Sequence, residues 1–196
     1  IRTPLTSIKG YAETLMGSEN LDKSMAGKFL NVILKNADHM SSMVNDLLRL
    51  AKNMHAGKDK EPEEVDITEA VESVIRDLSP AALDKSVELT NQVDPEHGYL
   101  VMADPQHLSE VLRNLMENAI HYGPDRGKVW VEAARREEML EVSVHDQGSG
   151  IPEKERERIF ERFYRGSARQ EMNDKNGHSG LGLAICKQLV SGMGGK

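Results

Sequence analysis

Hydrophobic residues over the first quarter of the chain recur at alternating steps of four and three, the spacing that lines side chains along one seam of a helix. A first series predicts a helix over residues 1–16, and a second series after the turn-like segment GSENLD predicts another helix ending near residue 54. The first series is Ile1, Leu5, Ile8, Ala12 and Leu15, and the second is Ala26, Leu30, Ile33, Ala37, Met40, Val44, Leu47, Ala51 and Met54. The pattern predicts an all-α helical hairpin.

The apolar stripe of the second helix is wider than the seam of a two-stranded coiled coil. Phe29, Val32, Met43 and Leu48 extend it on either side, so a lone pair of helices would leave much of it in water. A second copy of the hairpin would cover it, which predicts a homodimer whose two hairpins form a four-helix bundle. The alternative is a hairpin that packs against the domain that follows it in the same chain.

The period of the pattern changes after the charged segment NMHAGKDKEPEEVD, which contains Gly and Pro and predicts a linker at residues 55–65. The remaining residues, 66–196, predict an α+β domain. Its helices are expected at 67–78, at 105–121 with Asp104 as N-cap and Pro105 in the first helical position, and from near Gly180 to about residue 195. Its strands are expected at KVWVEAA and LEVSVHD, joined by the polar hairpin RREEM.

Composition narrows the class of protein. The 196 residues are 38% hydrophobic and 29% charged, as in globular proteins of one or two domains. The net charge of −7 and the absence of a basic run argue against nucleic acid as a partner. The single cysteine, Cys186, excludes an internal disulfide and is expected to be a buried small hydrophobe. No apolar run approaches the roughly 18 residues of a membrane span, so we expect no membrane contact by this chain.

The segment NLMENAIHY is the first of three polar clusters that could carry chemistry. Asn114 and Asn118 stand one helical turn apart and offer two amide oxygens to the same side of a helix. Mg²⁺ prefers oxygen ligands and is usually shared with nucleotide phosphates. Taken alone, the pair could equally serve as capping or solvent-exposed residues.

The other two clusters are rich in glycine. DQGSGI places Asp146 at a strand end, followed by Gly148 and Gly150, which permit a tight turn and close approach of the backbone to a ligand. HSGLGLAI is a second glycine turn that enters a helix, where free N–H groups and the helix dipole favour phosphate. Either glycine pair alone could be ordinary turn chemistry, but the order and spacing of the clusters favour a ligand site.

In order, RTPLTSIKGY, NLMENAIHY, DQGSGI, IFERFYRG and SGLGLAI resemble the H-box, N-box, G1, F and G2 boxes of sensor histidine kinases. The resemblance covers nearly the whole chain. It implies a dimerisation and histidine-phosphotransfer hairpin at residues 1–54, forming a dimeric four-helix bundle. It also implies a catalytic domain at residues 66–196 with the α+β Bergerat (GHKL) ATP-binding sandwich, a mixed sheet backed by helices.

The resemblance also implies ATP and Mg²⁺ as cofactors and assigns residues to them. Asn114 would hold Mg²⁺, Asn118 would contact phosphates or support the metal, and Asp146 would accept a hydrogen bond from the adenine amino group. Gly148 and Gly150 would let the chain pass beneath the nucleotide. The remaining nucleotide-binding assignments are His121, Tyr122, Arg165, Gly180, Leu181 and Gly182. Two positions depart from the family, because His121 stands where lysine is usual and His178 where glycine is common.

Between the last two boxes, YRGSARQEMNDKNGH is long, polar and without an apolar period, which predicts a lid over the nucleotide. A disordered loop would have the same composition. Arg162, Arg165 and Arg169 are candidate phosphate contacts within or beside it. Phe160 and Phe163 are expected to anchor the start of the lid by packing against the core.

The family H-box begins with the phosphoacceptor histidine and ends in Thr or Asn followed by Pro, which the match places at Thr3 and Pro4. We therefore expect the acceptor upstream of Ile1, and we interpret the chain as a fragment truncated at both ends, since family members also continue into a closing strand pair. His39 is the nearest rival acceptor within the chain.

The implied activity is ATP-dependent histidine autophosphorylation followed by phosphotransfer to an aspartate on a response-regulator receiver domain. Thr3 matches a position that, in this family, helps to dephosphorylate the regulator. The resemblance implies a cytoplasmic location for this region, with the full-length protein anchored in the bacterial cytoplasmic membrane.

Two other functions remain open at the level of sequence. An ATPase of the gyrase, Hsp90 or MutL kind has a glutamate base that would align with Asn114, and an amide cannot take a proton, which favours the kinase. A scaffold that binds nucleotide without catalysis is the second alternative.

Overall fold

The computed structural model describes residues 2–18, 21–56, 61–164, 166 and 180–196. The chain divides into two compact units, which are described separately. The helical unit comprises residues 1–52 and 161–181, and the α/β unit comprises residues 53–160 and 182–196.

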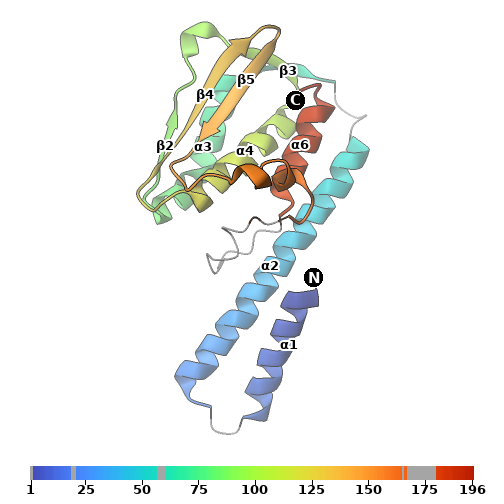
Figure 1. Ribbon diagram of the computed structural model, residues 1–196, viewed down its shortest axis with the longest axis vertical. Helices are drawn as coiled ribbons and strands as arrows, with labels where there is room; N and C mark the ends of the chain where they lie inside the picture. The colour runs from blue at the N-terminus through green and yellow to red at the C-terminus, as the bar shows by residue number, and fades with distance from the viewer. Residues whose placement is uncertain (1, 19–20, 57–60, 165, 167–179) are drawn as a thin grey trace. The chain divides into compact units, whose positions relative to one another are not determined.

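Two helices form most of the helical unit, as the heptad pattern predicts (Figure 1). α1 spans Arg2–Gly17 and α2 spans Lys23–Ala56. At 34 residues, α2 is a rod about 50 Å long at 1.5 Å per residue. The rings of Tyr11 and Phe29 lie 5.2 Å apart between centroids and pack α1 against α2.

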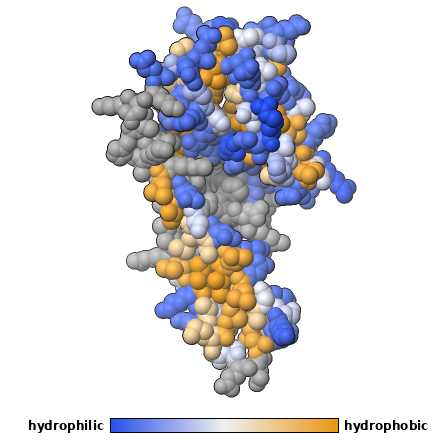
Figure 2. All heavy atoms as spheres, turned by 180° about the vertical axis from the view of Figure 1, so that it is seen from behind, coloured by the Kyte–Doolittle hydropathy of each residue, from blue (hydrophilic) through white to orange (hydrophobic). Residues whose placement is uncertain are grey.

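The hairpin leaves many large hydrophobic side chains in contact with water. Figure 2 shows the hydrophobic colour gathered over this helical part of the chain. The exposed fractions of seven such residues range from 48% to 89%; they are Leu5, Met16, Met25, Leu30, Leu34, Val44 and Leu48. Leu30, Val44 and Leu48 belong to the predicted stripe of the second helix, and the expectation that a single hairpin leaves the stripe uncovered is confirmed at these three positions, whereas Met43 of the same stripe is buried.

The α/β unit contains two small sheets. β1 (Glu63–Asp66) pairs antiparallel with β3 (Leu100–Ala103). In the second sheet, β4 (Lys128–Arg136) lies between two neighbours, pairing parallel with β2 (Glu88–Asn91) and antiparallel with β5 (Met139–His145). The second sheet is therefore mixed, as the family resemblance implies.

Three helices of this unit are labelled in Figure 1, and two of them, α4 and α6, form or follow polar clusters. α3 is Ile67–Asp84, α4 is Pro105–Tyr122 and α6 is Gly182–Gly192. Side chains of α3 and α4 pack against Val129 and Val131 of β4, and α6 packs against α4. Short 3₁₀ helices lie at Pro95–His97 (η1), Glu153–Glu155 (η2) and Arg158–Phe160 (η3).

The predicted linker at 55–65 is only partly correct. α2 continues through Ala56, and β1 begins at Glu63. The strands β1, β2 and β3 were not predicted, because each has four residues and shows too few alternations to stand out from its neighbours.

Helix ends also differ from the prediction. α3 was expected to stop at residue 78, before Pro80, but it continues to Asp84. Proline removes a hydrogen bond within a helix, yet Leu78 and Ala82 on either side of it are buried in the core, and this packing favours a continuous helix. α6 begins at Gly182 rather than near Gly180, because Gly180 has a φ of +74° and cannot be part of a right-handed helix.

The predicted packing of Phe160 and Phe163 is wrong. Their exposed fractions are 38% and 55%. Phe160 ends the short 3₁₀ helix η3 and Phe163 lies in the turn after it, rather than on the buried face of a long element, so aromatic composition alone misled the prediction. The ammonium of Lys187 lies 5.8 Å from the centre of the Phe160 ring, at the distance of a cation–π contact.

No helix among the described residues combines the length and the hydropathy that crossing a lipid bilayer requires.

Candidate functional site

α4 carries the N-box, and local sequence fixes where it begins. The Asp104 carboxylate accepts hydrogen bonds from the backbone N–H groups of Gln106 at 2.8 Å and His107 at 3.3 Å, and Pro105 occupies the first helical position. The cap fixes where the helix begins, and the spacing of the apolar residues decides which face enters the core. The core face carries Leu112, Met116, Ala119 and Ile120, which leaves Asn114 and Asn118 half-buried beside it.

The Asn114 side chain is oriented by its own helix. Its Nδ2 donates to the carbonyl oxygen of Glu110 at 2.9 Å, which turns Oδ1 toward the start of α6. A Cβ on Gly182 would lie only 3.1 Å from Asn114 Oδ1. The first residue of α6 therefore lies directly against this carboxamide, and glycine makes the close approach possible.

The turn after β5 is closed by Asp146. Its Oδ1 accepts a hydrogen bond from the N–H of Gly148 at 2.6 Å. A Cβ on Gly148 would lie 2.7 Å from Asp146 Oδ1 and 2.9 Å from the carbonyl oxygen of Tyr122, so no larger residue fits. The DQGSG turn thus rests against the last residue of α4. The structure brings Asp146 and the end of the N-box together, although 24 positions separate Asp146 from Tyr122 in the chain.

The remaining glycines of the two turns have different surroundings. Gly150 has a φ of +73°, a conformation in which side chains are strained, and no atom lies within 4 Å of a Cβ built there. Gly180 belongs to the helical unit, where its carbonyl oxygen accepts a hydrogen bond from the N–H of Phe163 at 3.1 Å. Leu181, in the same unit, is fully buried, with 0% exposure.

The carboxyl end of α4 has a partner that the sequence analysis missed. The Lys85 ammonium donates to the carbonyl oxygens of Ile120 at 2.9 Å, His121 at 2.9 Å and Gly123 at 3.2 Å. The His121 and Tyr122 rings meet edge to face with centroids 4.5 Å apart. No sequence signal indicates the lysine contact, because the partners lie 35 to 38 positions along the chain.

Cys186 lies between α6 and α4, as expected for a buried small hydrophobe. Its Sγ–H donates to the carbonyl oxygen of Val111, 3.8 Å away. Burial first, and then the negative charge of Glu110, raise the pKa of this thiol to about 12. The thiol is therefore neutral at physiological pH and has a packing role.

Other predicted residues lie elsewhere or outside the described part of the chain. Thr3 is an exposed residue of α1 in the helical unit, and His39 lies on α2 in the same unit. Arg162 is exposed. Arg165, Arg169 and His178, with most of the predicted lid, fall outside the described residues.

Within the α/β unit, two carboxamides, one carboxylate and the amino end of α6 thus come from three segments that are well separated in sequence. Carboxamide oxygens are ligands for a hard divalent cation. An exposed carboxylate at a strand end can accept a hydrogen bond from an amino group, and free N–H groups at a helix start attract phosphate.

Two family models match the chain. The model of the His Kinase A (phospho-acceptor) domain matches residues 1–55. The model of the histidine kinase-, DNA gyrase B- and HSP90-like ATPases matches residues 103–196.

Among curated proteins, sensor histidine kinase WalK of Bacillus subtilis (strain 168) is 35% identical over 197 residues, covering 100% of this chain and 32% of WalK. The signal transduction histidine-protein kinase/phosphatase MprB of Mycobacterium sp. (strain KMS) is 36% identical over 202 residues, covering 100% of this chain and 37% of MprB. The chain spans about a third of the length of these relatives.

Solved structures show the same kinship. A mycobacterial sensor histidine kinase MprB matches with a TM-score of 0.57 and 32% identity, over 68% of this chain and 80% of that chain. Full-length ShkA in complex with AMPPNP matches with a TM-score of 0.65 and 29% identity, over 98% and 39%. Histidine kinase ThkA in complex with response regulator protein TrrA matches with a TM-score of 0.67 and 25% identity, over 90% and 52%. Because the two family models match successive parts of the chain and these relatives are sensor histidine kinases, the chain belongs to the sensor histidine kinases.

Proposed function

We propose that this chain is the catalytic core of a sensor histidine kinase, which uses ATP to phosphorylate a histidine and passes the phosphoryl group to an aspartate of a response regulator. The observation that carries the proposal is that these segments lie in contact: Gly182 lies against Asn114, and the turn containing Asp146 and Gly148 lies against the end of α4. The nucleotide bound by ShkA and the regulator bound by ThkA, as their structures are described, support the same assignment.

Asp146 is the proposed adenine-recognising residue. Its Oδ1 already takes the Gly148 N–H, so Oδ2 is the oxygen that would accept from the exocyclic amino group of adenine. A hydrogen bond to a charged acceptor contributes about 1.5–3 kcal/mol. Guanine presents a carbonyl at the equivalent position, so the same oxygen would disfavour it.

Asn114 and Asn118 are the proposed magnesium-binding residues, with Asn114 as the direct ligand and Asn118 supporting the metal shell or contacting phosphates. The fit rests on the chemistry of the ligand atoms, because the Asn114 amide nitrogen donates to the Glu110 carbonyl and its oxygen, which faces Gly182 at the start of α6, is the atom left to bind a cation. Bound there, Mg²⁺ would offset the negative charge of the nucleotide phosphates.

The start of α6 is the proposed phosphate cradle of the α/β unit. Gly182 brings backbone to within contact of Asn114, and the first N–H groups of a helix have no partners within it. A ring nitrogen of His121 would contribute a further hydrogen-bond donor to the phosphates. Tyr122 and Gly150 complete the site, while the roles of Arg165, Gly180 and Leu181 stay predictions from the resemblance.

The chain's part in phosphoryl transfer is to position the phosphoryl donor and to offset the negative charge on the phosphoryl oxygens. The γ-phosphoryl would pass in line to an imidazole nitrogen of the H-box histidine. Donor and acceptor belong to separate domains, so an upstream sensor could control the rate through their docking.

Partners of the kinase core follow from the hairpin. Its exposed leucines and methionines favour a homodimer through a four-helix bundle. The receiver domain of a regulator would bind near the Thr3 end of α1, and Thr3 would support dephosphorylation of that regulator. We place this core in the cytoplasm and the full-length protein at the bacterial cytoplasmic membrane.

Labelled ATP tests the proposal. The chain, extended upstream of Ile1 so that it carries the H-box histidine, is incubated with [γ-³²P]ATP and Mg²⁺. Protein-bound label that survives base but not acid is expected, since phosphohistidine has that stability. Release of free phosphate without protein label would indicate an ATPase, and neither product would indicate a nucleotide-binding scaffold.

A further inference from the structure

Lys85 makes a convergent set of contacts at the end of α4. An ammonium has three N–H donors, and the three carbonyl oxygens around it belong to Ile120, His121 and Gly123. Its side chain is 31% exposed, which limits screening by water, and its ammonium also pairs at 3.8 Å with the carboxylate of Asp125, which is 80% exposed. The three carbonyl contacts are shorter than this ion pair, whose carboxylate is mostly in water, so the ammonium is directed mainly at the helix end.

The backbone of Lys85 is itself fixed. Its N–H donates to the carbonyl oxygen of Ala82 at 3.2 Å as the cap of α3, and its own carbonyl oxygen accepts from the N–H of Arg126 at 3.0 Å. A side chain that starts from a fixed backbone loses less conformational freedom when its tip is held. Lys85 thus joins the end of α3 to the end of α4.

The last four carbonyl groups of a helix have no partner within it and carry the negative end of its dipole. In α4, the Ala119 carbonyl accepts from the N–H of Gly123 at 2.9 Å, and the carbonyls of Ile120 and His121 accept from the Lys85 ammonium, whose positive charge offsets the negative end of the dipole. The fourth carbonyl, that of Tyr122, lies against Gly148. The lysine therefore stabilises the last helical turn of α4, and the DQGSG loop packs against that helical turn.

We propose that Lys85 is a positioning residue of the nucleotide site: its ammonium fixes the last turn of α4 and, through the contact of Tyr122 with Gly148, the place of Asp146. The inference rests on the proposed function, since it concerns how the adenine-recognising carboxylate is held. Lys85 lies outside the polar clusters that the family boxes define, and it contacts the N-box through the backbone carbonyls of Ile120 and His121.

Calorimetric titration of the 196-residue chain with AMPPNP and with GMPPNP, both with MgCl₂, tests this inference. Lys85→Met keeps the length of the side chain and removes its charge and donors. We expect its dissociation constant for AMPPNP to rise about five- to twentyfold and its preference for AMPPNP over GMPPNP to fall, because small displacements of a positioned group are costly. Hydrogen exchange should quicken at Gly123 and Gly148.

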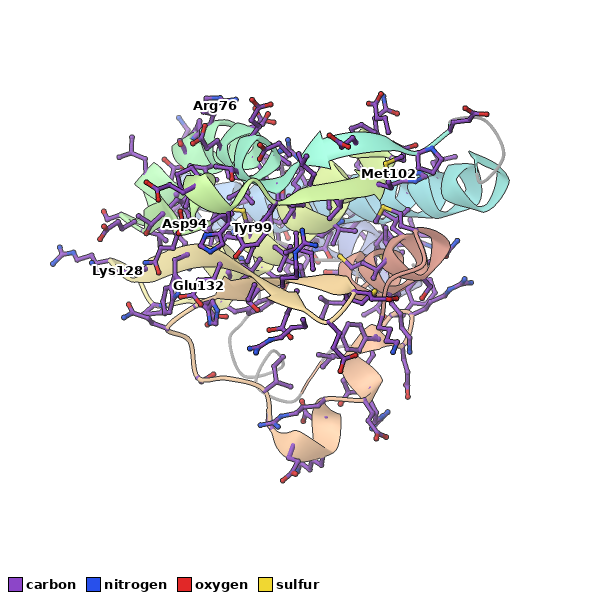
Figure 3. The ribbon with its side chains drawn as sticks, turned by 90° about the horizontal axis from the view of Figure 1, so that it is seen from above. Arg76, Asp94, Tyr99, Met102, Lys128 and Glu132 are labelled. Carbon is purple, nitrogen blue, oxygen red and sulfur yellow. The ribbon has the colours of Figure 1, made fainter. Side chains whose placement is uncertain are left out.

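Lys128→Met is the matched control. Lys128 begins β4 and extends away from the sheet (Figure 3), and its ammonium pairs with Glu88 at 2.9 Å on the surface. Removing this lysine changes net charge equally but should leave both dissociation constants within twofold of the wild-type values. Measurements are made at least 20 °C below the melting temperature of each variant, so that a loss of global stability does not change the folded fraction.

Each outcome decides the matter. The inference is overturned, with the proposed function intact, if Lys85→Met binds AMPPNP as tightly and as selectively as the wild type. It is also overturned if Lys128→Met loses as much AMPPNP affinity as Lys85→Met does. If Lys85→Met does not fold, Lys85→Arg is measured, since a planar guanidinium cannot direct three donors from one nitrogen to three carbonyl oxygens; weaker binding supports the inference and wild-type binding overturns it. A wild-type chain that binds no nucleotide overturns both.

Discussion

Replacing Gly148 by alanine tests the geometry of the site most directly. The added Cβ would meet Asp146 Oδ1 at 2.7 Å and the Tyr122 carbonyl oxygen at 2.9 Å. Ordinary contacts begin near 3.4 Å, so the turn or the helix end must move by about half an ångström, as in other overpacked sites. The Asp146 side chain can rotate, but the Tyr122 carbonyl is backbone at the end of a packed helix.

The expected consequence is loss of nucleotide affinity. A displaced Asp146 would forfeit a charge-assisted hydrogen bond of about 1.5–3 kcal/mol, which corresponds to a rise of about ten- to a hundredfold in the dissociation constant. Overpacking should also lower the free energy of unfolding by about 1–3 kcal/mol. Calorimetric titration with AMPPNP and MgCl₂ measures the first quantity, and urea denaturation measures the second.

Gly192→Ala is the control for this substitution. Gly192 ends α6, and no atom lies within 4 Å of a Cβ built there. The Gly192→Ala variant should bind AMPPNP with the dissociation constant of the wild type. If Gly148→Ala binds AMPPNP with an unchanged dissociation constant, or if Gly192→Ala loses as much affinity, the steric reasoning about the DQGSG turn is refuted.

Three further predictions concern other parts of the chain. Asp146→Asn keeps an oxygen for the Gly148 N–H but removes the charge, so its AMPPNP dissociation constant should rise at least about tenfold in the same titration, and an unchanged value would contradict the adenine role. The pKa of Cys186 is raised from 9.0 to about 12, so the thiol should react with iodoacetamide at pH 8 about a thousandfold more slowly in the folded chain than in urea. The free energy of unfolding that this raised pKa contributes below pH 9 should be lost as the pH rises toward 12. Equal reaction rates in the folded chain and in urea would contradict the burial of the thiol. Leu30→Glu, at an exposed position of the apolar stripe, should convert a dimer to a monomer in light scattering, whereas Lys28→Glu should not, and a wild-type chain that is already monomeric would refute the bundle.

Sequence predicted best where the physical cause is local. The start of α4 was predicted correctly because the cap at Asp104 and the proline at 105 act within one turn of the helix. The long β4–β5 hairpin was predicted because seven or more residues alternate between the two faces of the sheet. The four-residue strands were missed, and α3 passes Pro80, because packing of distant residues decides both.

The same distinction applies to the candidate site. The order of the polar clusters identified the family, because carboxamides, a carboxylate and glycine turns are residue types that can be recognised along the chain before their places in space are known. The sequence could not show that the Tyr122 carbonyl lies against Gly148 or that Gly182 lies against Asn114. Those contacts depend on how helices and strands pack.

The sequence by itself therefore determined the helical hairpin, the main α/β elements and the residue types of the candidate site. Each of these shows as a hydrophobic period or as a motif of a few neighbouring residues. Only the tertiary structure decided that Lys85, far from every motif, holds the end of α4. The physical reason is that a lysine reaching backbone carbonyls selects no particular side chain among its partners. Such a contact leaves no pattern in the sequence, and folding alone brings its two ends together.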